Sequence, residues 1–573
     1  MAITNAEIAK QFETYADMLE IKGANPFKIR AYRNAARIVQ NIAKPLEELV
    51  EEGYDLTKLP GIGADLSLYI KEIVKTGKFS KLEEIKKEIP PTLLDLLSIE
   101  GLGPKRIKIL YEKLGVTSME DLRRAAESGA IEKLPGFGPV LVERIKKGVR
   151  LAKKAGHRYM WSEAKEYVED LLDYLGQLDL DHLVVAGSFR RKKETVGDLD
   201  ILATAKDFSE VIRHFVRYPK IKEVVSAGST RSTVILQNDL QVDLRSVADE
   251  SYGSALHYFT GSKAHNIAVR KLAIELGLKV NEYGVFRGEE RIAGATEEEV
   301  YKAVGLCYIE PELRENRGEI EACKAGKLPK LITLGDIRGD LHMHSRHSDG
   351  KSSIEELALA AKELGYEYIA ITDHSQRLTV AKGLDEKRAL EEIEEIRKID
   401  EQIDGLTILA GIEVDILEDG SLDMSDEVLG ELDVVIAAVH YKFNLSKEKQ
   451  TTRVIKAMEN PFVHIVAHPT GRMIGGREPM DLDMEEIFEK AKEFGVAMEI
   501  NAQPERLDLN DVHIKLAKEM GVKMAINTDS HNRFSLHYME YGINQARRGW
   551  CEKSDVINTL SLKSLRKFLK ARR

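Results

Sequence analysis

Seven short hydrophobic runs, separated by amphipathic segments, constrain the fold of residues 336–573 more than any other feature of the chain. In order, the runs are IRGDLHMHS, YIAITDHS, TILAGIEVD, DVVIAAVHYK, VHIVAHPTGR, VAMEINAQP and KMAINTDSH. The segment between the first two, SIEELALAAKELG, begins with a capping box at Ser353 and Glu356 and ends at Gly365, as a helix does. Repeated strand–helix units of this kind predict a parallel, barrel-like sheet.

Histidines and carboxylates end most of these runs. Because functional side chains of a parallel barrel gather at the C-terminal ends of its strands, we expect them to meet at one rim. Ligands with nitrogen and oxygen donors and no thiolate suit Zn, Mn or Fe, and a cluster of two or three ions would lower the pKa of a bound water and orient a phosphate. The candidate metal set is His342, His344, Asp349, His374, Glu413, His440, His468, Asp529 and His531.

Two arginines near this set are candidate phosphate clamps. Arg472 lies in HPTGR and Arg506 lies in QPERLDL. A guanidinium can bind a phosphate through paired N–H groups, and an exposed arginine that is simply solvated is the alternative for each.

A pair of acidic residues interrupts a second hydrophobic run, in GSFRRKKETVGDLDIL. Side chains at positions i and i+2 of a strand point the same way, so Asp198 and Asp200 converge. The segment STVILQNDLQVDLRSV reads as a hairpin that turns near Asn238 and Asp239, and its second strand can add Asp243. Three close carboxylates repel unless cations lie between them, and two Mg²⁺ or Mn²⁺ ions would serve an in-line phosphoryl displacement. The alternative is a solvated strand face.

Three glycine motifs stand in the front part of the chain: LPGIGADL (59–66), IEGLGPKR (99–106) and LPGFGPVL (134–141). With amphipathic helical sequence on both sides, each predicts a helix-hairpin-helix element whose backbone N–H groups approach a phosphate without reading bases. The alternative is a helix turn with glycine as a C-cap. The first 160 residues are also basic, although the chain carries a net charge of -10. A basic segment of this kind favours a nucleic-acid partner.

The motifs resemble a known family once they are taken together. Gly-Ser at 187–188, Asp-x-Asp at 198–200 and the later Asp243 resemble the nucleotidyltransferase superfamily. With GSFRR, the segment YFTGSKAHNIAVR (258–270) resembles the family X DNA polymerases, the group of DNA polymerase beta. The resemblance covers roughly residues 1–318 and includes NPFKIRAYRNAA (25–36).

This resemblance implies roles for individual residues. Asp198 and Asp200 would bind both metals, and Asp243 would bind one metal and take the proton of the primer 3′-hydroxyl. The implied nucleotide-binding residues are Arg158, Gly187, Ser188, Arg191, Gly197, Tyr258, Phe259, Gly261, Lys263, Asn266 and Arg270. The implied DNA contacts are Lys28 and Tyr32, near the 5′-phosphate of a gap, and the hairpin residues Gly61, Gly63, Gly101, Gly103, Lys105, Gly136 and Gly138.

The sequence departs from the family pattern at two places. Lys263 stands where relatives often have an acid beside the incoming base. The deoxyribose-phosphate lyase of the family needs a lysine amine, which would fall at Tyr69 with a supporting lysine at Asp65. A phenol cannot form an imine, so we predict no lyase activity by that route, and Lys71 or Lys81 would serve only with a shifted geometry.

The histidine set resembles the PHP (polymerase and histidinol phosphatase) family over roughly residues 336–573, with every ligand position of that family filled. The resemblance implies a trinuclear, commonly Mn²⁺-dependent site that hydrolyses phosphoesters. Joined to a family X polymerase, as in the bacterial and archaeal PolX enzymes, it implies a 3′–5′ exonuclease. Removal of 3′-phosphates and incision at abasic sites are related activities.

We therefore expect a multidomain α+β and α/β protein, with helical hairpin domains at 1–85 and 86–155, a palm at 156–248, a thumb-type subdomain at 249–318, a linker at 319–335 and a distorted (β/α)7 PHP barrel at 336–573. The predicted function is gap-filling DNA synthesis in repair with 3′–5′ trimming. The expected cofactors are two Mg²⁺ or Mn²⁺ ions in the palm and up to three Mn²⁺ or Zn²⁺ ions in the PHP part. The alternatives are a DNA-end-binding scaffold with inactive sites, and an enzyme whose PHP part is a small-molecule phosphatase.

The sequence also leads to expectations about partners and cellular compartment. Gapped or primer–template DNA and dNTPs are the expected partners, with no membrane and no protein partner, and the chain is expected to act as a monomer. The first residues lack a signal-peptide pattern and no apolar run is long enough to cross a bilayer. Cys307, Cys323 and Cys551 lie far apart and form no CxxC pair, which argues against a disulfide framework or a cysteine zinc site and for a reducing, cytoplasmic location.

Overall fold

The computed structural model describes residues 3, 5–40, 42, 44–99, 101–139, 141–143, 145–146 and 158–572. The chain divides into two compact units, of which the first is Met1–His157 with Lys220–Ala227 and Thr233–Asp239, and the second is the remainder. The expected domain boundary at 155/156 lies outside the described residues.

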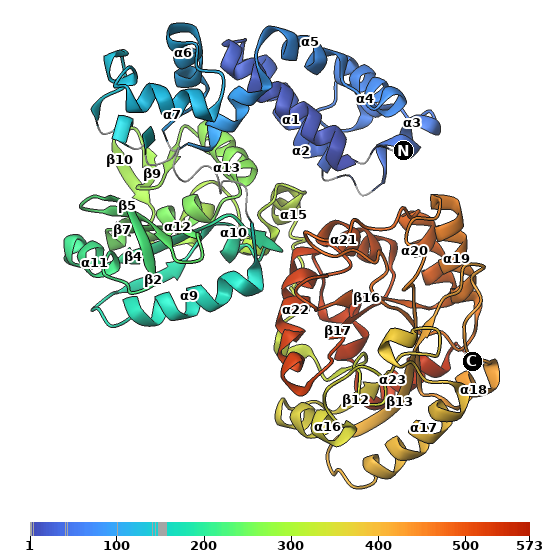
Figure 1. Cartoon of the computed structure of the whole chain (residues 1–573). Coiled ribbons are helices and arrows are strands. Elements are labelled where there is room, and N and C mark those ends of the chain that lie inside the picture. The colour runs from blue at the N-terminus through green and yellow to red at the C-terminus, as the bar shows by residue number, and fades with distance from the viewer. Residues whose placement is uncertain are drawn as a thin grey trace. The chain divides into compact units, whose positions relative to one another are not determined.

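The front part of the first unit is helical (Figure 1). Its helices are α1 (Asn5–Lys22), α2 (Pro26–Gln40), α3 (Leu46–Glu51), α4 (Ala64–Thr76), α5 (Ser80–Glu88), α6 (Pro104–Leu114) and α7 (Met119–Glu127). An aromatic cluster of Phe12, Tyr15, Tyr32 and Phe79 lies in its core, with Tyr69 packed against it.

The three glycine motifs form turns that lead into helices, but each is preceded by a 3₁₀ turn rather than directly by an α-helix. These turns are η1 (Leu56–Lys58), η2 (Pro91–Ser98) and η3 (Ile131–Lys133). In each motif the first glycine is left-handed, with φ of 91° at Gly61, 87° at Gly101 and 85° at Gly136, which glycine adopts without strain. The second glycine is the N-cap of the following helix at Gly63 and Gly103.

The palm places the acidic strand in the interior of its sheet. Strand β4 (Asp198–Thr204) lies between β2 (His182–Val185), which is antiparallel to it, and β7 (Gln241–Val247), which is parallel. The register sets Asp200 directly opposite Asp243, which confirms that the third carboxylate comes from a neighbouring strand. The other palm elements are β1 (Tyr159–Met160), α9 (Trp161–Leu175), α10 (Gly187–Arg190), β3 (Thr195–Val196), α11 (Phe208–Phe215), β5 (Ile221–Ala227) and β6 (Arg231–Leu236).

The elements of the thumb-type region pack around a small hydrophobic core. It comprises α12 (Tyr252–Thr260), α13 (Lys263–Glu275), an antiparallel sheet of β8 (Lys279–Asn281), β9 (Gly284–Arg287) and β10 (Glu290–Ala293), α14 (Glu297–Ala303) and α15 (Glu319–Lys324). The segment 319–335 is not wholly a linker, because α15 buries Ile320 and Cys323 in this core. The cysteine pattern argued against a disulfide framework, but one pair of cysteines, Cys307 and Cys323, forms a disulfide with a Cα–Cα distance of 5.9 Å. These two cysteines are 16 residues apart in the sequence, and no sequence pattern indicated that they pair.

Seven parallel strands in consecutive order form the nearly closed barrel of the C-terminal part: β11 (Gly339–Asp340), β12 (Tyr368–Ile371), β13 (Thr407–Asp415), β14 (Val434–Ala438), β15 (Ile465–Val466), β16 (Ala497–Asn501) and β17 (Met524–Asn527). The ends of the first and last strands meet, since the N–H of His344 donates to the carbonyl of Ser530 at 2.8 Å. All seven predicted strands are therefore present, although β11 and β15 are only two residues long.

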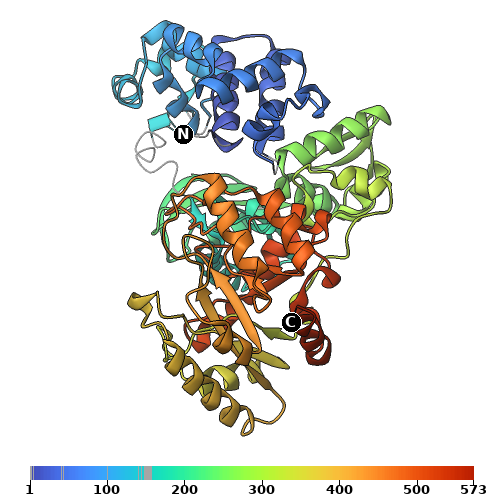
Figure 2. The same cartoon turned by 90° about the vertical axis from the view of Figure 1, so that its right-hand side faces the viewer.

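Helices lie on the outside of these strands in both views (Figure 1, Figure 2). They are α16 (Ile354–Glu363), α17 (Glu386–Asp400), α18 (Asp426–Glu431), α19 (Lys447–Glu459), α20 (Met484–Phe494), α21 (Asp511–Met520), α22 (Met539–Arg548) and α23 (Leu562–Lys570). The capping box predicted at Ser353 and Glu356 is confirmed at the start of α16. None of the helices in the described part of the chain is both long and apolar enough for a membrane span.

Candidate active sites

The palm gathers three carboxylates on two neighbouring strands. Asp198 is exposed, Asp200 is half-buried, and Asp243 is 5% exposed. Gly187 adopts a left-handed φ of 62°, and a Cβ there would lie 2.8 Å from Oδ2 of Asp200, so the glycine allows a close approach to that carboxylate. Asp243 accepts from Gln241 at 2.8 Å and from Arg231 at 3.2 Å. Burial and the neighbouring Asp198 and Asp243 raise the pKa of Asp200 to about 7.

A pocket of about 680 Å³ opens beside these carboxylates. It brings together all the predicted nucleotide-binding residues along with Asp198 and Asp200. Two lining residues were not predicted, Lys193 and Ile267. Lys193 directly follows GSFRRK and adds a cation to the pocket wall, so the run of basic residues was a usable signal.

The polar side chains of this pocket are held by hydrogen bonds. Arg158 donates to the side chain and carbonyl of Thr195, at 2.8 and 2.6 Å. Asn266 donates to the carbonyl of Tyr258 at 2.7 Å, and the Arg270 guanidinium lies 5.0 Å from the centre of the Tyr258 ring. Lys263 is exposed at the start of α13.

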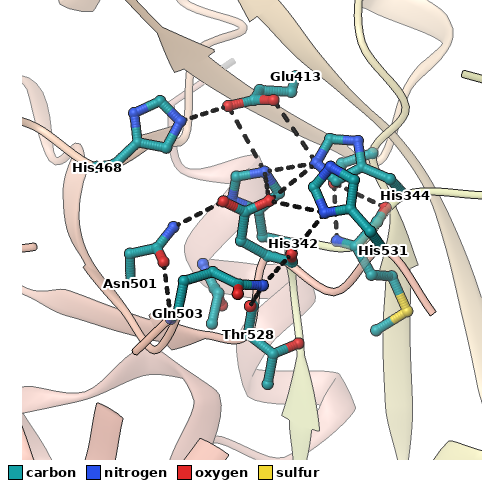
Figure 3. Close-up of polar contacts among 12 residues, drawn as sticks. His342, His344, Glu413, His468, Asn501, Gln503, Thr528 and His531 are labelled. Carbon is teal, nitrogen blue, oxygen red and sulfur yellow. Dashed lines mark hydrogen bonds and ion pairs between the residues drawn. The ribbon is translucent and has the colours of Figure 1, made fainter. Parts of the chain in front are cut away.

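The barrel brings all nine residues of the candidate metal set to one rim. Figure 3 shows five of them, His342, His344, Glu413, His468 and His531. Glu413 lies at the centre, with an oxygen 2.7 Å from Nδ1 of His374 and another 2.8 Å from Nε2 of His468. Nε2 of His440 is 3.4 Å from the same carboxylate. The remaining members lie beside them, with Nε2 of His344 at 3.2 Å from Asp529. Three overlapping groups have ligand atoms within 4.8 Å of one another: His344, Asp349, His374 and His531; His342, His344 and Asp529; and His374, Glu413 and His440.

Further carboxylates, which were not predicted, orient these imidazoles. Glu499 is fully buried and lies 2.7 Å from Nδ1 of His342, and Asp415 lies 2.9 Å from Nδ1 of His440. Such contacts fix the ring so that Nε2 faces the ligand cluster. The signal was the strand period, since Asp415 stands two residues after Glu413 on the same side of β13.

Neighbouring charged groups and burial shift the pKa values of the rim histidines. Burial opposes protonation of His531, but its contacts with Asp349 and Asp529 raise its pKa to about 9. Burial and the neighbouring His374 and His531 lower the pKa of His344 to about 4.

The arrangement of atoms at both sites fits divalent cations. In the barrel, Nε2 of His342 and Nε2 of His344 face each other at 3.1 Å. The buried oxygen Oε2 of Glu413 and Nδ1 of His374 are 2.7 Å apart, but neither atom makes a hydrogen bond of suitable geometry among the described residues. Lone pairs that converge in this way suit metal ligation better than hydrogen bonding. In the palm, three carboxylates that repel one another likewise suit cations that prefer oxygen ligands.

The two candidate phosphate clamps differ. The side chain of Arg472 is 13% exposed and pairs with Glu194 of the palm at 2.5 Å. This partner comes from another part of the chain and could not be read from the sequence, and it competes with a phosphate for the guanidinium. Arg506 lies 3.8 Å from Asp529, at the rim.

Most predicted DNA contacts of the first unit lie at its surface. Lys28, Gly61, Gly63, Gly103, Lys105, Gly136 and Gly138 are exposed, and Gly101 is half-exposed. Tyr32 differs, since the residue is 6% exposed and packs within the aromatic cluster. Arg144 and Lys147, two basic residues beside the third motif, lie outside the described residues.

Family models cover most of the chain. They are a helix-hairpin-helix domain at 3–79, a SAM-like helix-hairpin-helix tandem at 93–150, a DNA polymerase beta palm at 161–272, a DNA polymerase beta thumb at 255–315 and a PHP domain at 340–503.

Curated relatives match the whole chain or its halves. The DNA polymerase/3′-5′ exonuclease PolX of Bacillus subtilis (strain 168) is 41% identical over 98% of this chain and 99% of the relative. A protein named probable phosphatase from Thermoanaerobacter sp. (strain X514) is 31% identical over 41% of this chain and 95% of its own length. DNA polymerase lambda of Arabidopsis thaliana is 27% identical over 50% of this chain and 57% of its own length. With polymerase-beta-like palm and thumb models, helix-hairpin-helix models and a PHP model in one chain, and this identity over its full length, the protein belongs to the PolX family.

Proposed function

We propose that this protein is a DNA-directed DNA polymerase that fills short gaps in damaged DNA, and that its PHP part is a 3′–5′ exonuclease. The observation that carries the proposal is the presence of two separate sets of metal-binding side chains in one chain. Asp198 and Asp200 line a pocket large enough for a nucleotide, with Asp243 opposite Asp200, and nine histidine and carboxylate side chains converge at the barrel rim.

In the polymerase reaction, the chain's own residues bind, orient and select. Ser188 and Arg191 hold the triphosphate, while Tyr258, Phe259 and Gly261 form the wall that excludes a ribose 2′-hydroxyl. Asp198, Asp200 and Asp243 would hold two Mg²⁺ or Mn²⁺ ions, which when bound would supply positive charge for the attacking and leaving oxygens. Asp243 accepts the proton of the primer 3′-hydroxyl, and the contacts of its carboxylate with Gln241 and Arg231 fix its direction.

In the PHP reaction, the nine rim residues would hold up to three Mn²⁺ or Zn²⁺ ions, which when bound would lower the pKa of water and neutralise phosphate charge. Glu499 and Asp415 keep His342 and His440 directed at the cluster. Arg506, beside Asp529, is the remaining arginine positioned to bind the phosphate.

Domain roles follow from the same proposal. We assign DNA gripping to 1–85 and 86–155, nucleotidyl transfer to 156–248, nucleotide selection to 249–318 and hydrolysis to 336–573. The exposed glycine turns of the first unit offer backbone N–H groups to the phosphates of gapped DNA. We further propose that the protein acts as a monomer.

One pair of variants tests the two-site proposal on a single labelled, gapped primer. Asp200→Ala should abolish extension and leave trimming intact, and His344→Ala should do the reverse. Loss of both activities in either variant would contradict two separate sites.

The likeness to the Thermoanaerobacter protein favours a second candidate for the PHP part, a small-molecule phosphatase. Hydrolysis of a DNA 3′ end and of p-nitrophenyl phosphate, compared at equal Mn²⁺, separates the two candidates. A large preference for the simple ester would support the phosphatase.

A further inference from the structure

The barrel part reaches the wall of the nucleotide pocket through one buried arginine. Arg548 is the last residue of α22, and its side chain is 4% exposed. Its Nη1 donates to the carbonyl of Arg191 at 2.7 Å and lies 3.2 Å from a carboxylate oxygen of Glu315. The palm residue Arg191 is thus held from outside the palm.

Glu315 links Arg548 to the side chain of Arg191, because both guanidinium groups contact its carboxylate. Nε of Arg191 donates to the same carboxylate oxygen at 3.0 Å, while its Nη1 donates to the carbonyl of Thr260. Among the described residues Nη2 of Arg191 makes no hydrogen bond, so that group remains for an anion in the pocket that Arg191 lines. Two fixed contacts limit the guanidinium to one orientation.

Arg548 is itself fixed by the barrel. Its Nη2 lies 2.5 Å from Asp511, the first residue of α21, and Arg317 lies 2.9 Å from the same carboxylate. A buried guanidinium that bridges two carboxylates and a carbonyl has little freedom, because each lost contact would leave a buried polar group without a partner.

We propose that Arg548 is a positioning residue for the polymerase site, although it belongs to the PHP part of the chain. It holds Glu315 and the backbone of Arg191 so that the Arg191 guanidinium is already oriented for the triphosphate of the incoming nucleotide. The proposal rests on the proposed role of Arg191 in nucleotide binding. It implies that the nucleotide site is completed by the nuclease part.

The test is single-nucleotide gap filling with kcat and the KM for dNTP measured separately. Arg548→Met should raise this KM about tenfold, the effect of one charge-assisted hydrogen bond, and leave kcat within about threefold. Arg548→Lys keeps a buried cation but cannot serve three acceptors in a fork, so its KM should lie between those of Arg548→Met and the unchanged protein. This milder variant keeps the test open if Arg548→Met does not fold, which thermal unfolding reports.

Arg547→Met is the matched control, because Arg547 is the neighbouring residue and binds Glu312 at 2.7 Å and the carbonyl of Ile332 at 3.0 Å, but makes no contact with Arg191 or Glu315 in the described part of the chain. Its KM for dNTP should stay within about twofold of the unchanged protein. Equal KM values for the Arg548 and Arg547 variants, or an Arg548→Lys KM no higher than that of the unchanged protein, would overturn the proposal.

Arg191→Ala separates failure of this inference from failure of the proposed function. If Arg191→Ala raises the KM for dNTP and the Arg548 variants do not, only the positioning role is wrong. If Arg191→Ala itself leaves the KM unchanged, the role of Arg191 is wrong and the positioning role falls with it.

Discussion

Asp200 and Asp243 lie directly opposite one another on the adjacent parallel strands β4 and β7. Two acids in this relationship repel in the absence of cations, and Asp198 stands on the same side of β4. The sheet therefore carries a local electrostatic cost that metal binding removes.

Asp200→Asn should remove part of that cost. In the presence of a chelator, we expect this variant to be about 1 kcal/mol more stable to urea than the unchanged protein, because a neutral amide no longer repels its neighbours. Extension of a gapped primer should nevertheless fall at least about a thousandfold. Asp179→Asn, at an exposed position, is the control and should change neither quantity. An Asp200→Asn variant less stable than the unchanged protein under chelation would contradict the repulsion.

Glu297 predicts a pH dependence that is independent of the metal sites. It is 5% exposed and binds Arg190 at 2.6 Å and Arg314 at 2.5 Å. Burial would raise its pKa, but the Arg314 and Arg190 guanidinium groups lower it to about 2. A carboxyl with a depressed pKa in the folded state stabilises the protein above its unfolded pKa and loses that contribution as pH falls through the folded value.

We therefore expect Glu297→Gln to lower the free energy of unfolding by about 3 kcal/mol at pH 7, since it leaves the buried Arg314 and the partly buried Arg190 without their carboxylate. The difference between the variant and the unchanged protein should shrink as pH falls from about 4.5 toward 2. Urea unfolding at a series of pH values measures it. A difference that stays constant over this range would show that the carboxylate charge is not the cause.

The fold was largely predictable, because its signals are local. Short hydrophobic runs that alternate with amphipathic segments predicted all seven barrel strands, and the capping box at Ser353 predicted the start of α16. Strand ends in a parallel sheet share one edge, which brings the nine rim residues together without knowledge of any contact.

Contacts between distant segments were not predictable. Arg472 read as a phosphate clamp, but it pairs with Glu194, which lies 278 residues away. The pairing of Cys307 with Cys323 depends on how α15 packs into the thumb core, and the spacing of the two cysteines does not predict it. In the sequence, Glu499 is one residue of the strand segment VAMEINAQP with no sign of a role. Only the folded barrel places it beside His342.

The lack of a lysine in the aromatic cluster of the first unit leads to a prediction about lyase chemistry. Tyr69 stands where the family lysine would fall, and its ring lies 5.1 Å from that of Phe79. The nearby Lys81 is paired with Glu84 at 2.8 Å. We expect no covalent adduct when the protein is treated with borohydride in the presence of DNA that carries a 5′-deoxyribose phosphate. An adduct that forms and then disappears in Lys81→Ala would show that Lys81 supplies the amine instead.

The second hairpin predicts a contribution to DNA binding that depends on salt. Lys105 is exposed beside Gly103, in the first turn of α6. Lys105→Ala should weaken binding to gapped DNA equally for all sequences, because it removes a phosphate contact. The slope of log affinity against log salt should fall by about 1. Lys113→Ala, at the other end of α6, is the control, and an equal loss in both variants would argue against a specific hairpin contact.

Glu499 leads to a prediction that separates metal binding from catalysis at the rim. Its carboxylate accepts from Nδ1 of His342 and also receives the backbone N–H of His468 at 2.7 Å, so it orients two candidate ligands at once. Glu499→Gln loses the charge that strengthens both contacts, and we expect the affinity for Mn²⁺ to fall by about 10- to 100-fold. Hydrolysis should then be weak at limiting Mn²⁺ and recover at excess Mn²⁺, whereas gap filling with Mg²⁺ stays unchanged. Titration of Mn²⁺ with a hydrolysis assay measures the shift. A loss of hydrolysis that excess Mn²⁺ does not restore would mean that Glu499 acts in the reaction itself, and not through the direction in which His342 and His468 point.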